Sequence, residues 1–248
     1  MKKLLSLIFL FGASVAIAQP DDDIVYYTDS EVEDSRFNIA LNLNPYFTDM
    51  RLINDDAANS QFNAFADDIE ADGSFRLDYG LDLFYEIGPS FHVGIGFGRS
   101  YGGYTWRNVN RDSLNPNITF DNEVAVSMWS VPIKVNFTTQ ISDVFSLEVV
   151  PSVEMNFIDN YNAIWTYAET ANAPADTSFK LNDRLRDLNW SVGLGIGGTY
   201  WFQDNLGIFF RGSVKYMLND MIQSDENFQW PRETMINFGA NIGMRVRF

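Results

Sequence analysis

The sequence predicts an all-β fold, a closed eight-stranded antiparallel up-and-down barrel. Three observations predict it. Apolar residues recur at every second position over eight stretches, short and long connections alternate between those stretches, and the second face of each stretch is rich in Gly, Ser and Asn. A period of two is the pattern of strands whose two faces meet different surroundings. The stretches lie at about residues 37–47, 74–87, 91–98, 130–137, 145–157, 188–202, 206–219 and 236–248.

The first four stretches carry their apolar residues at odd positions. Asn38, Arg76, Gly94 and Lys134 exemplify the polar or small residues between them. The apolar positions are Phe37, Ile39, Leu41, Leu43, Pro45 and Phe47; Phe75, Leu77, Tyr79, Leu81, Leu83, Tyr85 and Ile87; Phe91, Val93, Ile95 and Phe97; and Val131, Ile133, Val135 and Phe137.

The fifth stretch continues at odd positions and the last three use even ones. Glu148, Gly195, Arg211 and Asn241 exemplify their opposite face. The apolar positions are Phe145, Leu147, Val149, Pro151, Val153, Met155 and Phe157; Leu188, Trp190, Val192, Leu194, Ile196, Tyr200 and Phe202; Leu206, Ile208, Phe210, Val214, Tyr216 and Leu218; and Ile236, Phe238, Ala240, Ile242, Met244, Val246 and Phe248.

The fourth stretch is irregular. Val124, Val126 and Met128 have the opposite parity to Val131, which predicts either a bulge or a strand that extends past a membrane. Pro132 and Pro151 each remove a ladder donor, so we also expect local bulges at both prolines.

The connections sort by length. Turns near 88–90, 139–144 and 203–205 are short, whereas polar loops are expected at about 52–73, 107–123, 158–187 and 219–233. Short turns on one side and long loops on the other are the rule for transmembrane barrels of the outer membrane. Most of the stretches also reach the ~9–11 residues that a tilted strand needs to cross a bilayer.

The N-terminus has the pattern of a signal peptide, with Lys2 and Lys3, an apolar run, and Ala16-Ile17-Ala18 before Gln19. The predicted organisation is a signal peptide at 1–18, an acidic periplasmic tail at 19–35 and a barrel at 36–248. We therefore expect export to the outer membrane.

Composition excludes several functions. The chain has no Cys, which excludes disulfides and thiolate chemistry. It has one His. Its 33 acidic residues against 17 basic ones give a net charge of −16, which disfavours nucleic acid as a partner. No cofactor and no metal site are expected.

The two faces decide between a membrane barrel and a soluble, lipocalin-like one. A soluble barrel turns its apolar face inward and carries charge outside. Here the polar face is rich in Gly, which suits the crowded interior of a narrow barrel. The apolar face is therefore expected to meet lipid.

The last eight residues carry a specific motif, formed by Asn241, Gly243, Val246 and the terminal Phe248. With this motif the chain resembles the outer-membrane β-barrel domain proteins of Gram-negative bacteria, of the porin-family, OmpA/OmpX-like or PorT-like small barrels. The resemblance implies that the motif is the signal read by the barrel-assembly machinery. It implies location and fold, and it does not imply one function.

Charged residues of both signs are expected to face the interior as a network that fills the lumen, because an unpaired charge in a narrow interior is costly. A pore lined by charge is the alternative. One hypothesis pairs Arg245 and Arg247 with Glu86 or Glu148. The network comprises Arg76, Asp78, Asp82, Glu86, Lys134, Glu148, Glu154, Arg211, Lys215, Arg245 and Arg247.

No catalytic residue is predicted. His92 is expected inside the barrel near the periplasmic rim, which is the wrong face for a lipid hydrolase. Two aromatic girdles are expected. The outer girdle would contain Tyr101, Tyr104, Trp106, Tyr161 and Trp165, and the inner one Tyr85, Phe91, Phe137, Phe145, Phe202 and Phe248.

The acidic first long loop is interpreted as a hydrated surface, with ion bridging to lipopolysaccharide phosphates or display to a basic protein as alternatives. Its acids are Asp55, Asp56, Asp67, Asp68, Glu70 and Asp72. The favoured function is a non-enzymatic structural or interaction barrel that acts through its extracellular loops. A small-solute channel and an accessory barrel of a secretion or gliding apparatus remain alternatives, and a lipid hydrolase comes last.

Overall fold

The computed structural model describes residues 36–52, 70–110, 119–167, 175–223 and 233–248. The predicted signal peptide and acidic tail lie outside these ranges, as does most of the acidic first loop. No helix in the described part of the chain is long and apolar enough to span a membrane.

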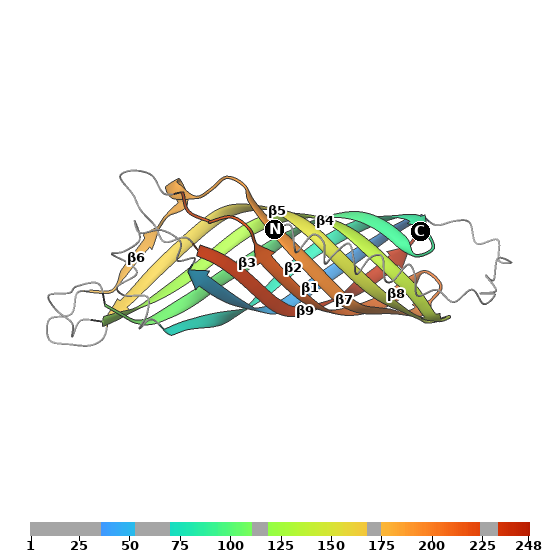
Figure 1. Cartoon of the computed structure of the whole chain (residues 1–248), viewed down its shortest axis with the longest axis horizontal. Coiled ribbons are helices and arrows are strands. Elements are labelled where there is room, and N and C mark those ends of the chain that lie inside the picture. Colours follow the sequence, from blue (N-terminus) through green and yellow to red (C-terminus); the bar gives the residue numbers. More distant parts are fainter. Residues whose placement is uncertain (1–35, 53–69, 111–118, 168–174, 224–232) are drawn as a thin grey trace, which may run out of the picture. The chain divides into compact units, whose positions relative to one another are not determined.

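Nearly all described residues belong to antiparallel strands, drawn in Figure 1. The strands are β1 (Phe37–Leu52), β2 (Glu70–Gly88), β3 (Phe91–Asn110), β4 (Thr119–Ser142), β5 (Phe145–Tyr167), β6 (Thr177–Lys180), β7 (Asn189–Gln203), β8 (Leu206–Met217) and β9 (Glu233–Arg247), with a short 3-10 helix, η2, at Asn182–Arg184.

Eight of these strands close into a ring. Neighbours follow the order β4-β3-β2-β1-β9-β8-β7-β5, and pairing of β4 with β5 completes the circle. The first and last strands meet, with Ile39 opposite Val246. Closure leaves no sheet edge along the ring and pairs its backbone groups between strands. The predicted fold class is confirmed, with β6 as a small addition that pairs with β5.

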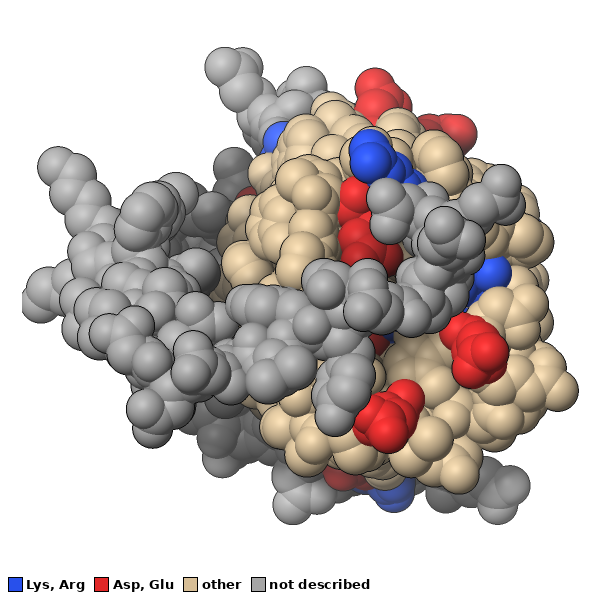
Figure 2. Space-filling view, turned by 90° about the vertical axis from the view of Figure 1, so that its right-hand side faces the viewer, with Lys and Arg blue, Asp and Glu red and all other residues tan. Residues whose placement is uncertain are grey.

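The two faces of the ring differ as the alternation predicts. Leu41, Leu81 and Phe210 stand outward and are about half exposed, whereas Asn42, Asp82 and Arg211 point into the ring and are buried. Figure 2 views the end that carries the C-terminus: large uncharged surfaces surround acidic and basic side chains that lie close to one another.

Several strands are longer than predicted. β3 and β4 take up both ends of the loop expected at 107–123, and β5 runs on to Tyr167. The predicted loop boundaries are therefore wrong in these places. The polar outward residues there resemble a loop in sequence, but their inward neighbours are apolar. At the end away from the C-terminus, β3, β4 and β5 reach beyond β1 and β9 (Figure 1).

The irregularity predicted in the fourth stretch comes from strand extension and not from a bulge in β4. Even-numbered residues of β4 stay inward from Phe120 to Asn136 without a break. The bulge lies in β5, where Ser127 pairs with Asn160 and Met128 with Ile158, so that Asp159 is the additional residue. The register is regular through Pro132 and Pro151, so the bulges expected at the prolines are wrong.

The extended end has an apolar interior. This outer apolar cluster is made of Tyr104, Trp106, Phe120, Val124, Val126, Met128, Ile158, Tyr161, Ala163, Met217, Met221, Ile222 and Met235. Three members of the predicted outer girdle, Tyr104, Trp106 and Tyr161, belong to this cluster, and a fourth, Trp165, is partly buried against it, so the outer girdle is wrong for these four residues. Tyr161 points inward because the bulge at Asp159 reverses the parity of β5 beyond that residue.

Close strand approach at Gly197 supplies a testable prediction. A Cβ added there would clash with the backbone carbonyl of Phe210 on β8. We expect Gly197→Ala to force β7 and β8 apart and to destabilise the barrel by about 1–3 kcal/mol. The measurement is the urea midpoint of the refolded protein. Gly212→Ala is the matched control, because its nearest neighbour is 3.9 Å away, and equal midpoints for the two variants would contradict the prediction.

Candidate functional site in the barrel interior

Eight of the eleven predicted interior charges form two groups inside the ring. An inner group lies toward the short turns and contains Asp82, Lys134, Glu148, Arg211 and Arg245. An outer group, toward the apolar cluster, contains Asp78, Glu154 and Lys215. Period-two alternation puts these residues on one face, and closure of the ring brings strands distant in sequence together.

Glu148 is the centre of the inner group, and its side chain is fully buried. Arg211 on β8 approaches Oε2 with Nη2 at 2.6 Å and donates from Nε at 2.8 Å. Arg245 on β9 donates from Nη1 to Oε1 at 2.5 Å and from Nη2 to Oε2 at 3.3 Å. Thr199 on β7 donates to Oε1 at 2.7 Å. One carboxylate thus ties together four neighbouring strands.

Two aromatic rings pack against these guanidinium groups. The Arg211 guanidinium carbon lies 4.2 Å from the centroid of Phe209, and that of Arg245 lies 5.4 Å from the centroid of Phe84. Both phenylalanines are inward and almost fully buried. The rings fill space beside the ion cluster and stabilise its cations through their π faces.

A second ion pair lies in the same group. Lys134 on β4 is 2.6 Å from Oδ2 of Asp82 on β2, and Asn42 on β1 donates to the same oxygen at 2.9 Å. Side chains from β1 and β4 therefore converge on Asp82 of β2.

The outer group is centred on Lys215 of β8. Its Nζ lies 3.4 Å from Oδ2 of Asp78 and 3.3 Å from Oε2 of Glu154. Hydroxyls satisfy the carboxylates further: Tyr46 and Ser100 donate to Asp78 at 2.7 and 2.8 Å, and Ser130 donates to Glu154 at 3.1 Å.

The two groups balance each other in charge. The inner group has two carboxylates and three cations, and the outer group has two carboxylates and one cation. Their excess charges are therefore +1 and −1, and the eight residues together are neutral. Such neutrality lowers the cost of burying charge in a narrow, low-dielectric interior.

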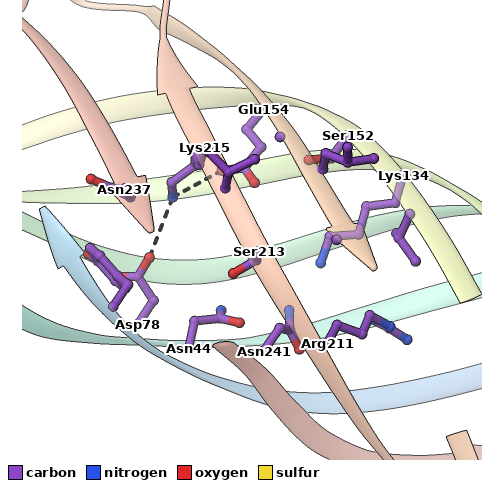
Figure 3. Close-up of a pocket in the computed structure, with 16 residues that line it drawn as sticks. Asn44, Asp78, Lys134, Ser152, Glu154, Arg211, Ser213, Lys215, Asn237 and Asn241 are labelled. Carbon is purple, nitrogen blue, oxygen red and sulfur yellow. Dashed lines mark hydrogen bonds and ion pairs between the residues drawn. The ribbon is translucent and has the colours of Figure 1, made fainter. Parts of the chain in front are cut away.

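A polar cavity of about 90 Å³ lies between the groups (Figure 3). Lys134 and Arg211 line one part of it, and Asp78, Glu154 and Lys215 line another. Its remaining lining includes amide and hydroxyl side chains of Asn44, Ser152, Ser213, Asn237 and Asn241. The volume and the polar lining suit a small cluster of water molecules, because one water needs only about 10–15 Å³ by this measure.

The remaining predicted residues lie apart from these groups. Arg76 reaches toward Gly103, where an added Cβ would be 2.7 Å from its Nη2. Arg247 stacks on Trp201 at 4.5 Å. His92 is buried inside, with Nε2 3.7 Å from Oε2 of Glu86. Of the hypothesised pairs, the structure brings Arg245 into contact with Glu148.

Sequence reasoning missed the neutral partners of the network. Tyr46, Phe84, Thr199 and Phe209 all have inward parity, and that parity was the available signal. The C-terminal motif divides between the faces: Asn241 lines the cavity, whereas Phe248 is exposed and donates its backbone N–H to Phe37 at 2.9 Å. Among the described residues no group of three or more His, Asp or Glu is placed to hold a metal ion.

Comparisons with known proteins add a likeness in fold. No protein-family model matches the sequence, and no curated protein matches it. Among solved structures, Neisserial surface protein A is 9% identical with a TM-score of 0.43, covering 86% of this chain and 97% of its own. The outer membrane protease OmpT from Escherichia coli is 10% identical with a TM-score of 0.46, covering 86% and 97%.

The outer membrane protein OprG from Pseudomonas aeruginosa is 11% identical with a TM-score of 0.46, covering 86% of this chain and 95% of its own. These likenesses concern the barrel alone, and the protease activity belongs to OmpT. The resemblance to small outer-membrane barrels holds at the level of fold, because the chain's own strands close into such a ring.

Proposed function

We propose that the chain is an integral outer-membrane β-barrel whose interior does not conduct, and that it acts as a structural or interaction protein at the cell surface. The observation that carries the proposal is the reversal of faces: apolar side chains stand outward around the ring, and paired charges are buried inside it. A soluble barrel has the opposite arrangement. Lipid is the surrounding in which this exterior is stable.

Three layers of side chains support a closed interior. The Glu148 cluster lies toward the short turns, the Lys215 group lies farther out, and the outer apolar cluster fills the extended end. The interior of an eight-stranded barrel is just wide enough for side chains to fill it. Passage of a solute would require separation of buried ion pairs and of the apolar cluster.

The interaction role rests on the extended end. The outer apolar cluster packs against β3, β4 and β5 beyond the ion network, and this packing supports presentation of their outward polar residues to a partner. Lipopolysaccharide and an unidentified protein are the candidate partners, and the barrel-assembly machinery is the expected partner during insertion.

A small-solute channel is the second candidate, favoured by the polar cavity between the two groups. Planar-bilayer conductance separates the candidates. We expect no steady conductance from the refolded protein, with folding verified by the mobility shift between unheated and boiled samples. Steady conductance that changes in Lys215→Gln, whose side chain lines the cavity, would contradict the proposal and support the channel.

A further inference from the structure

One ion pair lies on the outward face of the barrel. Arg99 follows Phe97 on the outward side of β3, and its Nη1 is 2.7 Å from Oδ2 of Asp159 on β5. Ser127 on β4 joins them: its hydroxyl accepts from Arg99 Nη2 at 2.9 Å and donates to Asp159 Oδ1 at 2.9 Å. We refer to Arg99, Ser127 and Asp159 as the outward triad.

The bulge in β5 builds this triad. Asp159 is the additional residue between the Met128–Ile158 and Ser127–Asn160 pairs. The bulge keeps Asp159 outward beside Arg99 while it turns Tyr161 inward to the apolar cluster. Bulges re-aim side chains in this manner.

The triad lies where the outward surface changes character. Toward the short turns, Phe97, Ile133 and Phe157 are exposed and apolar. In the other direction, the outward residues of β4 include Glu123 and Asp121. A charged side chain on the lipid-facing surface of a barrel is costly at the bilayer centre and nearly without cost at the interface. The triad therefore belongs at an interface.

The length of β3 agrees with this position. Arg99 is eight residues beyond Phe91, the first residue of the strand. With a rise of ~3.3 Å per residue and a tilt of ~40°, these residues span about 20 Å along the barrel axis. The apolar band of an outer-membrane barrel is about 25 Å tall, so the backbone of Arg99 lies within about 5 Å of the far boundary, a distance that a long Arg side chain can span.

The aromatic surroundings are those of an interface. The Arg99 guanidinium carbon lies 4.7 Å from the centroid of Trp129 and 5.8 Å from that of Tyr101. Trp and Tyr concentrate at headgroup level, where one part of the ring is in contact with lipid and the other with water. Asp159, with 42% of its side chain exposed, can reach the same layer.

We infer that the outward triad, set on Trp129 and Tyr101, is a lipid-headgroup anchor that fixes how deep the barrel sits. Headgroup donors reach the exposed carboxylate of Asp159, and Arg99, whose side chain is only 14% exposed, holds that carboxylate in place. Parts of β3, β4 and β5 beyond the triad then stand outside the bilayer around the outer apolar cluster. This inference rests on the proposed membrane function, and it assigns the level on the barrel at which the bilayer ends.

The absence of Cys from the chain allows a depth measurement with single cysteines. A fluorophore is attached at Ala125→Cys, two residues beyond Ser127, or at Ile95→Cys within the apolar band. The proteins are refolded into phosphatidylcholine vesicles with nitroxide-labelled acyl chains. With the native triad we expect strong quenching at residue 95 and little at residue 125.

In the double variant Arg99→Leu/Asp159→Leu, the hydrocarbon layer should extend past the triad toward residue 125. Quenching at residue 125 should therefore rise at least twofold. Arg107→Leu/Asp72→Leu is the matched control, because this exposed pair lies 2.5 Å apart beyond the triad and should leave quenching unchanged. Unchanged quenching at residue 125 in the Arg99/Asp159 variant would overturn the anchor alone. Absence of quenching at residue 95 would overturn the membrane function itself.

Discussion

Replacement of Glu148 by glutamine is expected to destabilise the barrel by about 3–5 kcal/mol, the usual cost of breaking a buried ion pair from one side. The carboxylate is the shared partner of Arg211 and Arg245, and both guanidinium groups are buried beside Phe209. Loss of the carboxylate charge leaves two buried cations without their shared anion. The urea midpoint of the refolded protein measures the effect.

Glu123→Gln is the matched control, because Glu123 is exposed on the outer surface of β4 and should change stability little. A triple variant, Glu148→Met/Arg211→Met/Arg245→Met, removes all three charges and should recover most of the lost stability. Equal midpoints for Glu148→Gln and Glu123→Gln would show that the inner group is not a coupled ion cluster.

Replacement of Leu81 by arginine is expected to destabilise the folded protein in bilayers by about 2–4 kcal/mol, the cost of a cation at mid-depth on the lipid-facing surface of a barrel. Leu81 is half exposed on the outward face of β2, opposite Leu41 and Phe97. On a water-exposed surface the same substitution would change stability by only a few tenths of a kcal/mol.

Ile164→Arg separates the two environments. Ile164 is also outward and exposed, but it lies on β5 beyond the bulge at Asp159, in the part assigned to the outside of the bilayer. We expect it to leave the unfolding midpoint in lipid vesicles nearly unchanged. Equal destabilisation by both variants would place Ile164 in lipid. An unchanged unfolding midpoint in both variants would show that Leu81 does not face lipid.

The alternation of residue types was enough to predict the ring and its faces. Asp78, Glu148 and Arg245 have inward parity in the sequence, and the structure places each of them inside. The short turns and the meeting of the first and last strands also follow from the sequence, since closing an even number of up-and-down strands makes the first and last strands antiparallel neighbours.

The particular partners could not be predicted. Glu148 contacts Arg211, 63 residues away, and Arg245, 97 residues away, because the stagger between strands sets which inward residues share a level. Periodicity within one strand carries no information on that stagger.

The extension of β3, β4 and β5 around the outer apolar cluster was not predicted, for a different reason. Most of its outward residues on β4 and β5 are polar, so the segments resemble loops, while Tyr104 and Trp106 resemble a girdle. A single additional residue, Asp159, reverses the parity of β5 and sends Tyr161 inward. One-residue insertions of this kind are invisible to pattern matching unless the partner strand is known.

The central claim, that the apolar face meets lipid, is tested most directly by thiol reactivity along β1. Single cysteines at Ala40, Leu41, Asn42 and Leu43 are compared in lipid vesicles, using an apolar maleimide that partitions into the bilayer and a charged one that stays in water. We predict that positions 41 and 43 react only with the apolar reagent, whereas positions 40 and 42 react slowly with both. Rapid reaction of positions 41 and 43 with the charged reagent would contradict the claim, because it would place the apolar face in water.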